Sequence, residues 1–98
     1  MGWTIVLEDE NGQSIRTLPK EFDYDKLDQL DLNSFVLLKY IDFYGDTTFN
    51  TLQLDDLQAD FEKLKIIEVN QIDIIVQILD LIKESQGEVH TYIKFCGD

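Results

Sequence analysis

The residues best suited to chemistry gather in one short stretch, DFYGDTTFN at positions 42–50. Asp42 and Asp46 supply two carboxylates within five positions, and Thr47 and Thr48 add two hydroxyl groups. Hard divalent cations bind oxygen ligands of these kinds. The segment could therefore bind a cation or a small molecule, although the spacing of its oxygens is generic.

The chain offers little else for catalysis. It contains one histidine, His90, and one cysteine, Cys96, and no nucleophile or metal motif includes either of them. It also lacks the G-x-x-x-x-G-K-[ST] pattern of a phosphate-binding loop. We therefore expect no catalytic residues, no metal site, no cofactor and no enzymatic activity.

The end of this stretch has the features of a helix start. Asn50 is a favoured N-cap residue, and Gln53 three positions later completes a capping box. Phe49 and Leu54 occupy the two positions of a hydrophobic staple. Helix entry explains these residues without a ligand, but it leaves the residues before Phe49 unexplained.

The helix that follows is expected to be amphipathic. Its apolar stripe consists of Leu54, Leu57, Phe61 and Leu64. The opposite face is almost purely acidic, and we expect it to point into solvent. It consists of Asp55, Asp56, Gln58, Asp60 and Glu62.

Charge is the strongest global signal. The chain has 20 acidic and 8 basic residues, which give a net charge of −12 at pH 7. Such a surface repels nucleic acids and anionic membranes and attracts basic proteins, although acidity also fits a protein that only needs to stay soluble. We predict a surface that binds a basic protein partner through aromatic anchors and carboxylates. Its residues are Tyr44, Asp46, Phe49, Asp55, Asp56 and Asp60.

An N-terminal β-hairpin over residues 3–18 is expected from two apolar segments that flank an Asn-Gly turn. A two-residue turn would place Leu7 opposite Arg16. A three-residue loop with a left-handed Gly12 would place Leu7 opposite Ile15 instead. The second register puts more apolar side chains on one face, so burial favours it.

The middle of the chain predicts two more elements. Asp25 could cap a short helix over about 25–31. The run 34–43 is nearly continuous in apolar residues and is typical of a central strand. Gly45 follows it, where a positive φ would end the strand and reverse the chain.

A second helix is expected to be capped by Asn70 and to stop at Gly87. Residues 72–82 are apolar on more than one side, so this helix should lie between the sheet and a further layer. That layer is either the preceding helix or a second subunit, which would make the protein a homodimer. A final strand over 88–95 alternates apolar and polar residues.

The 98 residues, 44% of them hydrophobic, fit one globular domain over residues 1–98. No segment reaches the roughly 18 apolar residues of a membrane helix, and no basic leader precedes the first apolar run. We therefore expect a cytoplasmic protein. The predicted fold is a single α+β domain, in which the hairpin, a central strand and the C-terminal strand form an antiparallel or mixed sheet covered on one face by two helices.

Two resemblances bear on function. YGDTTFNTLQLDDL, with HTYIKFCGD near the C-terminus, is similar to a small family of uncharacterised bacterial proteins of about this length. FYGDTTFNTLQLDDL also resembles barstar-type immunity proteins, in which an aromatic and acidic segment enters an inhibitory helix. Those proteins follow that helix with a strand, whereas this chain continues into a second helix. The resemblance implies a loop and helix that occupy the active cleft of a basic nuclease.

Two hypotheses for function follow from these observations. The first is an acidic protein-binding module of immunity or antitoxin type, which neutralises a basic partner such as a nuclease toxin. The alternative is an accessory protein that binds a small molecule or a cation through the 42–50 loop.

Overall fold

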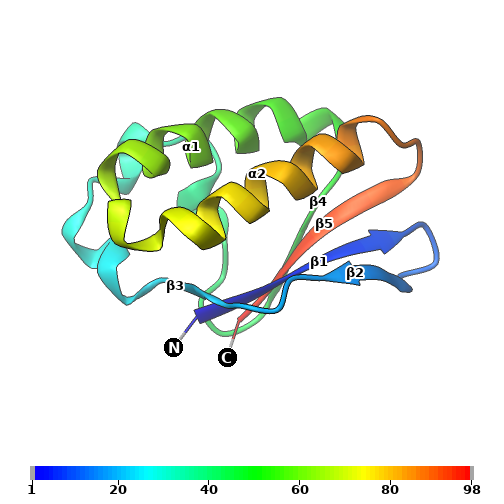
Figure 1. The fold of residues 1–98 in the computed structure, drawn as a ribbon, viewed down its shortest axis with the longest axis horizontal. Helices are drawn as coiled ribbons and strands as arrows, with labels where there is room; N and C mark the ends of the chain where they lie inside the picture. The colour runs from blue at the N-terminus through cyan, green and yellow to red at the C-terminus, as the bar shows by residue number, and fades with distance from the viewer. Residues whose placement is uncertain (1, 98) are drawn as a thin grey trace.

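The computed structural model describes residues 2–97 and confirms the α+β class, with two helices side by side on one face of a five-stranded antiparallel sheet (Figure 1). The helices are α1 (Leu54–Ile67) and α2 (Ile72–Gln86). The strands are β1 (Gly2–Asp9), β2 (Ser14–Thr17), β3 (Phe22–Asp23), β4 (Asp46–Phe49) and β5 (Thr91–Cys96). Short 3₁₀ helices occupy the connections: η1 (Asp25–Gln29), η2 (Leu32–Ser34), η3 (Leu38–Tyr40), η4 (Thr51–Gln53) and η5 (Val69–Gln71).

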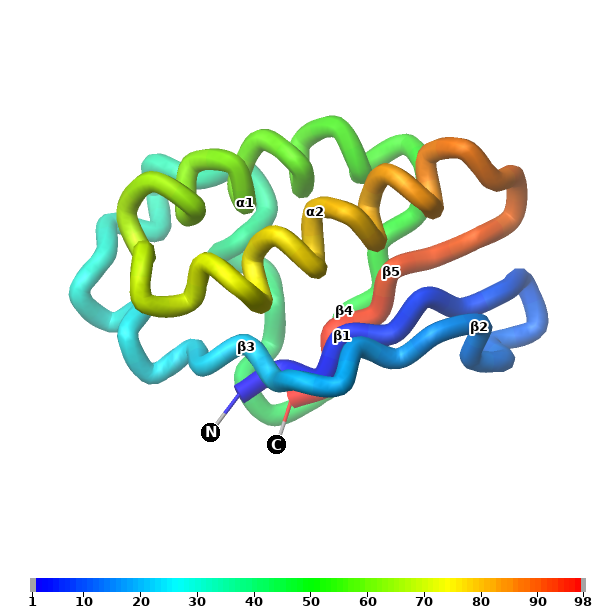
Figure 2. Tube along the Cα trace, in the orientation of Figure 1, coloured from blue at the N-terminus to red at the C-terminus, as the bar shows by residue number. Residues whose placement is uncertain are grey.

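The first and last strands of the described chain form the centre of the sheet. The strand order is β2-β1-β5-β4, and β3 also pairs with β1. β1 and β5 are paired from Thr4 opposite Cys96 to Asp9 opposite Thr91. The two ends of the chain therefore lie close together, as Figure 2 shows.

The core lies between this sheet and the two helices. Trp3, Ile5 and Phe95 have no exposed surface, and the Phe95 ring stacks on Phe61 of α1 at 5.7 Å between centroids. The predicted α1 stripe is confirmed, because all four of its residues are fully buried. The apolar breadth of α2 is also explained within one chain, since α2 packs against both the sheet and α1.

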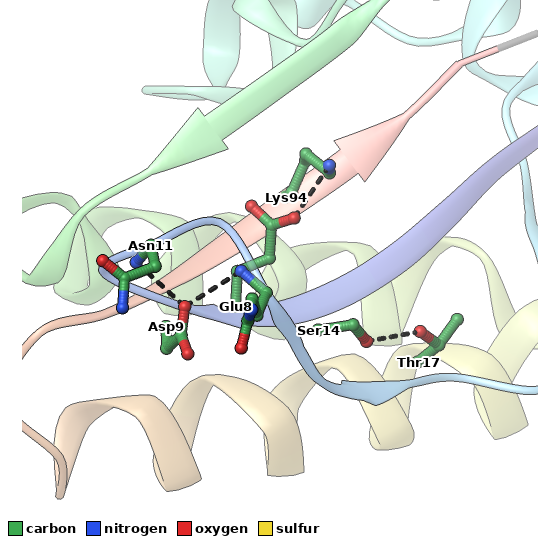
Figure 3. A network of polar contacts seen from close by, with 7 residues as sticks. Glu8, Asp9, Asn11, Ser14, Thr17 and Lys94 are labelled. Carbon is green, nitrogen blue, oxygen red and sulfur yellow. Dashed lines mark hydrogen bonds and ion pairs between the residues drawn. The ribbon is translucent and has the colours of Figure 1, made fainter.

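The turn of the hairpin has the expected three-residue loop. Gly12 has a φ of 77°, in the left-handed region that favours glycine. The Asp9 carboxylate accepts hydrogen bonds from the backbone N–H groups of Asn11 and Gln13, both at 2.9 Å (Figure 3). These bonds hold the loop in a single conformation.

The expected hairpin register is wrong beyond the turn. Glu8 pairs with Ser14, but the register then shifts and Leu7 pairs with Arg16, so a bulge absorbs Ile15. Ile15 is 52% exposed instead of facing the core. Arg16 takes the position on the helix side, where its guanidinium lies 3.1 Å from the Glu84 carboxylate of α2. A polar partner on α2 thus replaces the apolar contact that favoured the other register.

The predicted central strand over 34–43 is also wrong. This run forms η2, η3 and irregular backbone, and the strand expected there is replaced by β4, which starts at Asp46. Gly45 does not have the predicted positive φ. Among the described glycines, only Gly12 has a positive φ. A Cβ atom at Gly45 would instead lie 2.9 Å from Oδ2 of Asp42, so close packing favours glycine there.

Several predicted element ends differ from the structure. The short helix forms as η1, but Tyr24 occupies its N-cap position and Asp25 does not cap it. Asn70 likewise lies within η5 and does not cap α2, whereas Gly87 is the C-cap of α2 as predicted. The last strand begins at Thr91, not at 88, because the chain still turns through His90, whose φ is 65°.

Candidate functional site

The predicted helix start is confirmed. The Asn50 side chain accepts a hydrogen bond from the backbone N–H of Leu52 at 3.0 Å, and Gln53 Oε1 accepts one from the Asn50 N–H at 3.0 Å. This capping box begins η4, which leads directly into α1. It also fixes Phe49 at the end of β4, where the ring is 3% exposed and packs against Phe95. Phe49 is therefore a core residue and does not reach the surface.

Asp60 contradicts the expectation of a solvent-facing acidic side chain. It is 3% exposed, and its carboxylate accepts three backbone hydrogen bonds. The donors are the N–H groups of Val36 at 2.9 Å, Leu37 at 2.7 Å and Leu38 at 2.9 Å. Hydrogen bonds to a charged acceptor are roughly twice as strong as neutral ones. Asp60 therefore attaches the 34–43 run to α1, although the sequence predicted that this run is a strand.

We call this segment, residues 31–45, the anchored loop. One turn of α1 beyond the carboxylate, Lys63 donates from Nζ to the carbonyl oxygen of Ser34 at 2.8 Å. The same ammonium group lies 4.6 Å from the centroid of the Phe35 ring. Two charged side chains of α1 thus hold the loop through its backbone and through one aromatic ring.

The far end of the anchored loop is fixed to the sheet through Asp42. Its carbonyl oxygen accepts from Trp3 Nε1 at 2.9 Å, and its carboxylate accepts from the Tyr44 N–H at 2.8 Å. The Asp42 N–H in turn donates to Thr47 Oγ1 at 2.9 Å. The neighbouring Phe43 ring stacks on Tyr24 with centroids 4.4 Å apart. These contacts leave little freedom to the backbone that bears Tyr44.

An open hollow of about 380 Å³ lies on the anchored loop. It is lined by Leu32, Leu38, Lys39, Ile41, Asp42, Phe43 and Tyr44. Tyr44 is 72% exposed at its edge, and Tyr40 on the same loop is 66% exposed. Tyr40 and Lys39 are not among the predicted site residues, because both lie within the run that the sequence predicted to be a strand.

The six predicted site residues do not form one surface. Tyr44 and Asp46 are exposed at the start of β4, whereas Asp55 and Asp56 are exposed beyond its other end, at the start of α1. The strand between them is four residues long, which corresponds to about 13 Å at 3.3 Å per residue. Phe49 and Asp60 are both buried, so the predicted site separates into two exposed parts.

Of the two aspartates at the start of α1, one has a structural partner. Asp55 accepts a hydrogen bond from Gln86 Nε2 at 3.0 Å, and the same amide nitrogen donates to Gln58 Oε1 at 3.1 Å. Asp55 thus helps to hold the end of α2 against α1. Asp56 is exposed on the outer side of the helix.

Two groups on the sheet face away from the helices have altered pKa values. Hydrogen bonding to Glu8, at 2.8 Å, raises the pKa of the Lys94 ammonium group. Burial raises the pKa of the Cys96 thiol, and the negative charge of Asp46 adds to that rise. A raised pKa keeps the thiol protonated and unreactive at neutral pH.

Within residues 2–97 the structure brings together no group of three or more His, Cys, Asp or Glu side chains that could hold a metal ion. None of its helices combines the length and the apolar character that a membrane span requires.

Comparison with protein-family models, with curated proteins and with solved structures finds no match to this chain. The two resemblances noted in the sequence therefore stay predictions.

Proposed function

We propose that the protein is an acidic protein-binding module that contacts a basic partner through the anchored loop, with Tyr40 and Tyr44 as its aromatic anchors. This surface keeps Tyr44 and Asp46 from the sequence prediction and excludes Phe49 and Asp60, which are buried. The observation on which the proposal rests is the pair of exposed tyrosines beside a hollow in a loop held by buried hydrogen bonds.

Rigidity makes such a loop suitable for binding. Ordering a flexible loop or side chain on association costs free energy, which a loop already fixed in one conformation largely avoids. Tyrosine supplies a large contact area with few rotatable bonds, and it is enriched among the residues that dominate binding energy. A partner side chain of moderate size could enter the hollow beside Tyr44 while Tyr40 packs outside it.

The charge around the anchored loop favours a basic partner. Asp31, Asp42 and Asp46 are exposed there, and Lys39 is the one basic side chain between positions 31 and 46. The net charge of −12 adds a long-range attraction that accelerates encounter with a cation-rich surface. Within this class, an immunity or antitoxin protein that neutralises a nuclease toxin in the cytoplasm is the specific case we propose.

The test compares wild-type protein and variants as immobilised baits for proteins of the native host. Tyr44→Ala and Asp46→Lys should each lose a basic protein that the wild type retains. Tyr92→Ala and Asp73→Lys are matched controls, since they remove a tyrosine or reverse a charge away from the anchored loop. For the captured partner, the association rate should fall steeply with salt. A partner that is retained by the Tyr44 and Asp46 variants, at a rate independent of salt, would refute the proposal.

One observation favours a second candidate function. The hollow of about 380 Å³ lies within the usual range of small-molecule pockets, roughly 300–1,000 Å³. An accessory protein that binds a small molecule there would give heat in calorimetry with a panel of nucleotides and metabolites, and Tyr44→Ala would abolish it. Such a result, without a protein partner, would favour this candidate over the first.

A further inference from the structure

The connection between α1 and α2 exposes an unusual concentration of apolar side chains. Eleven large hydrophobic side chains are exposed in residues 2–97, and five of these fall within positions 66–76. They are Ile66 (80% exposed), Ile67 (44%), Val69 (62%), Ile72 (37%) and Val76 (37%). We call them the helix tip, which lies at the left end of the helix layer in Figure 1. A concentration of exposed apolar side chains is a feature of interaction sites on soluble proteins.

The amide side chain of Gln71 ties the helix tip to β3. Gln71 Oε1 accepts from the backbone N–H of Asp23 at 2.7 Å, and Gln71 Nε2 donates to the carbonyl oxygen of Asp23 at 2.9 Å. The amide therefore satisfies both backbone groups of one residue in β3. This clamp keeps the exposed side chains of the tip in a fixed arrangement.

A groove between the outer surfaces of α1 and α2 continues from the tip. It has a volume of about 130 Å³ and shares Val76 with the tip. Its charged lining residues are two acids and two bases: Glu62, Lys65, Asp80 and Lys83. The groove is thus mainly polar with balanced charge, and Val76 and Leu79 are its apolar lining residues.

This region is close to neutral in a strongly acidic chain. Residues 63–73 contain two lysines and two acids, and residues 20–26, which adjoin the tip through the Gln71 clamp, contain two lysines and three acids. Half of the eight basic residues thus lie in these two segments. A strongly basic partner gains little here, whereas a second copy of the chain meets little repulsion.

We infer that the helix tip and the adjoining groove form a homodimer interface, whose occupant is a second copy of this chain. Two copies can approach with least repulsion where their charge is balanced. In a two-fold contact each surface meets itself, so a groove with equal numbers of lysines and acids can place lysines of one copy opposite acids of the other. A stable dimer buries about 800 Å² per partner, roughly a seventh of the 5572 Å² surface of the chain. A dimer contact of that size must therefore include the groove as well as the helix tip.

The homodimer is independent of the proposed partner surface, because the anchored loop contributes none of these residues. The sequence predicted broad apolar burial for residues 34–43 and 72–82. The buried side chains of residues 72–82 pack within one chain. The dimer uses the exposed remainder of that helix and its connection.

Sedimentation velocity over a wide range of concentrations tests this inference. The wild-type protein should shift from the 11.5 kDa of one chain towards twice that mass. Ile66→Glu should raise the dimer dissociation constant about tenfold or more, since it removes a buried isoleucine and adds a charge. Val89→Glu is the matched control, because Val89 is also β-branched and is 78% exposed in the turn after α2. Tyr44→Ala should leave the dimer unchanged, which separates this test from that of the proposed function.

Charge exchange sharpens the test. Glu62→Lys and Lys65→Glu should each weaken the dimer alone, because each gives the groove an excess of one sign. An equimolar mixture of the two variants should restore association, since the two grooves are then complementary. A single-chain mass at every concentration overturns the inference. So does a dimer that Ile66→Glu and Val89→Glu weaken equally, or a mixture of the charge variants that associates no better than either alone.

Discussion

The anchored loop and the helix tip are two exposed, irregular regions that are held in different ways. Asp60 anchors the loop from α1 with a buried carboxylate that accepts three backbone N–H groups. Gln71 anchors the tip by bonding the N–H and carbonyl groups of one residue in β3. The first contact places a charge in the interior, where its removal leaves several donors without an acceptor. The second is neutral and partly exposed, so water can replace it at lower cost.

This difference indicates what each region requires of its neighbours. A long segment without regular hydrogen bonding must have its backbone groups satisfied from elsewhere, and a carboxylate can accept several of them at once. A short helix connection has fewer such groups, and one amide suffices. Rigidity outside helices and strands therefore depends here on a few polar side chains, and the comparison predicts a graded response to their removal.

Asp60→Ala should have the largest effect. It removes the acceptor of three backbone N–H groups, one of which is fully buried. Each unsatisfied donor costs about 1–3 kcal/mol, so we expect the free energy of unfolding to fall by about 3–5 kcal/mol. Urea unfolding measures this change. Asp56→Ala, at an exposed aspartate one turn earlier, should change stability by no more than about 0.5 kcal/mol. Equal effects of the two variants would show that the Asp60 anchor is not important.

Gln71→Ala should have a smaller and more local effect. It removes two hydrogen bonds of a partly exposed amide, so we expect a loss of about 1–2 kcal/mol. Hydrogen exchange of the Asp23 amide should accelerate more than that of the Leu38 amide, which the Asp60 carboxylate holds. Gln29→Ala, at an exposed glutamine, serves as the control. Uniform acceleration at both amides would mean that the tip and the loop open together.

Removal of the N-cap before α1 should give the third-largest loss of stability. Asn50→Ala removes the N-cap of η4 and should cost about 1 kcal/mol. Asn70→Ala should cost less, because Asn70 does not cap α2 despite a similar position before a helix. Thermal or urea unfolding of the two variants distinguishes them. A larger loss for Asn70 would contradict the described start of α2.

The smallest effect should come from the ion pair on the sheet face away from the helices, between the buried Glu8 and the partly exposed Lys94. Glu8→Gln should cost less than about 1 kcal/mol at pH 7. The folded state raises the pKa of Lys94, so the stabilisation is complete below the unfolded value near 10.4 and is lost as pH rises through the folded value. In a Cys96→Ser background, which removes the thiol that titrates nearby, the wild-type pair should lose more stability above about pH 10 than Glu8→Gln does. Parallel pH profiles would contradict the pairing.

The parts of the fold that depend on nearby residues could be predicted from the sequence. The capping box at Asn50 spans four positions, and the α1 stripe repeats every three or four residues. The left-handed Gly12 follows from a turn of a few residues. In each case the residues that determine the local structure lie within one short window.

The anchored loop could not be predicted in this way, because its hydrogen-bond acceptor lies 22 to 24 positions further along the chain. Without that acceptor, an apolar run such as 34–43 favours a strand. One signal was present in α1. Asp60 lies three residues after Leu57 and four before Leu64, so it borders the apolar stripe and does not lie opposite to it. A carboxylate at that position could have suggested a buried acceptor.

The place of β5 in the sheet has a consequence for synthesis on the ribosome. β5 lies between β1 and β4, so neither strand has its main neighbour until residue 96 has left the exit tunnel. Until then the nascent chain can form the hairpin and both helices, but their apolar faces have no completed sheet to cover them. Pairings between distant segments also form slowly. The newly made chain therefore depends on its last strand for protection from aggregation, and we expect it to engage chaperones before that strand is inserted.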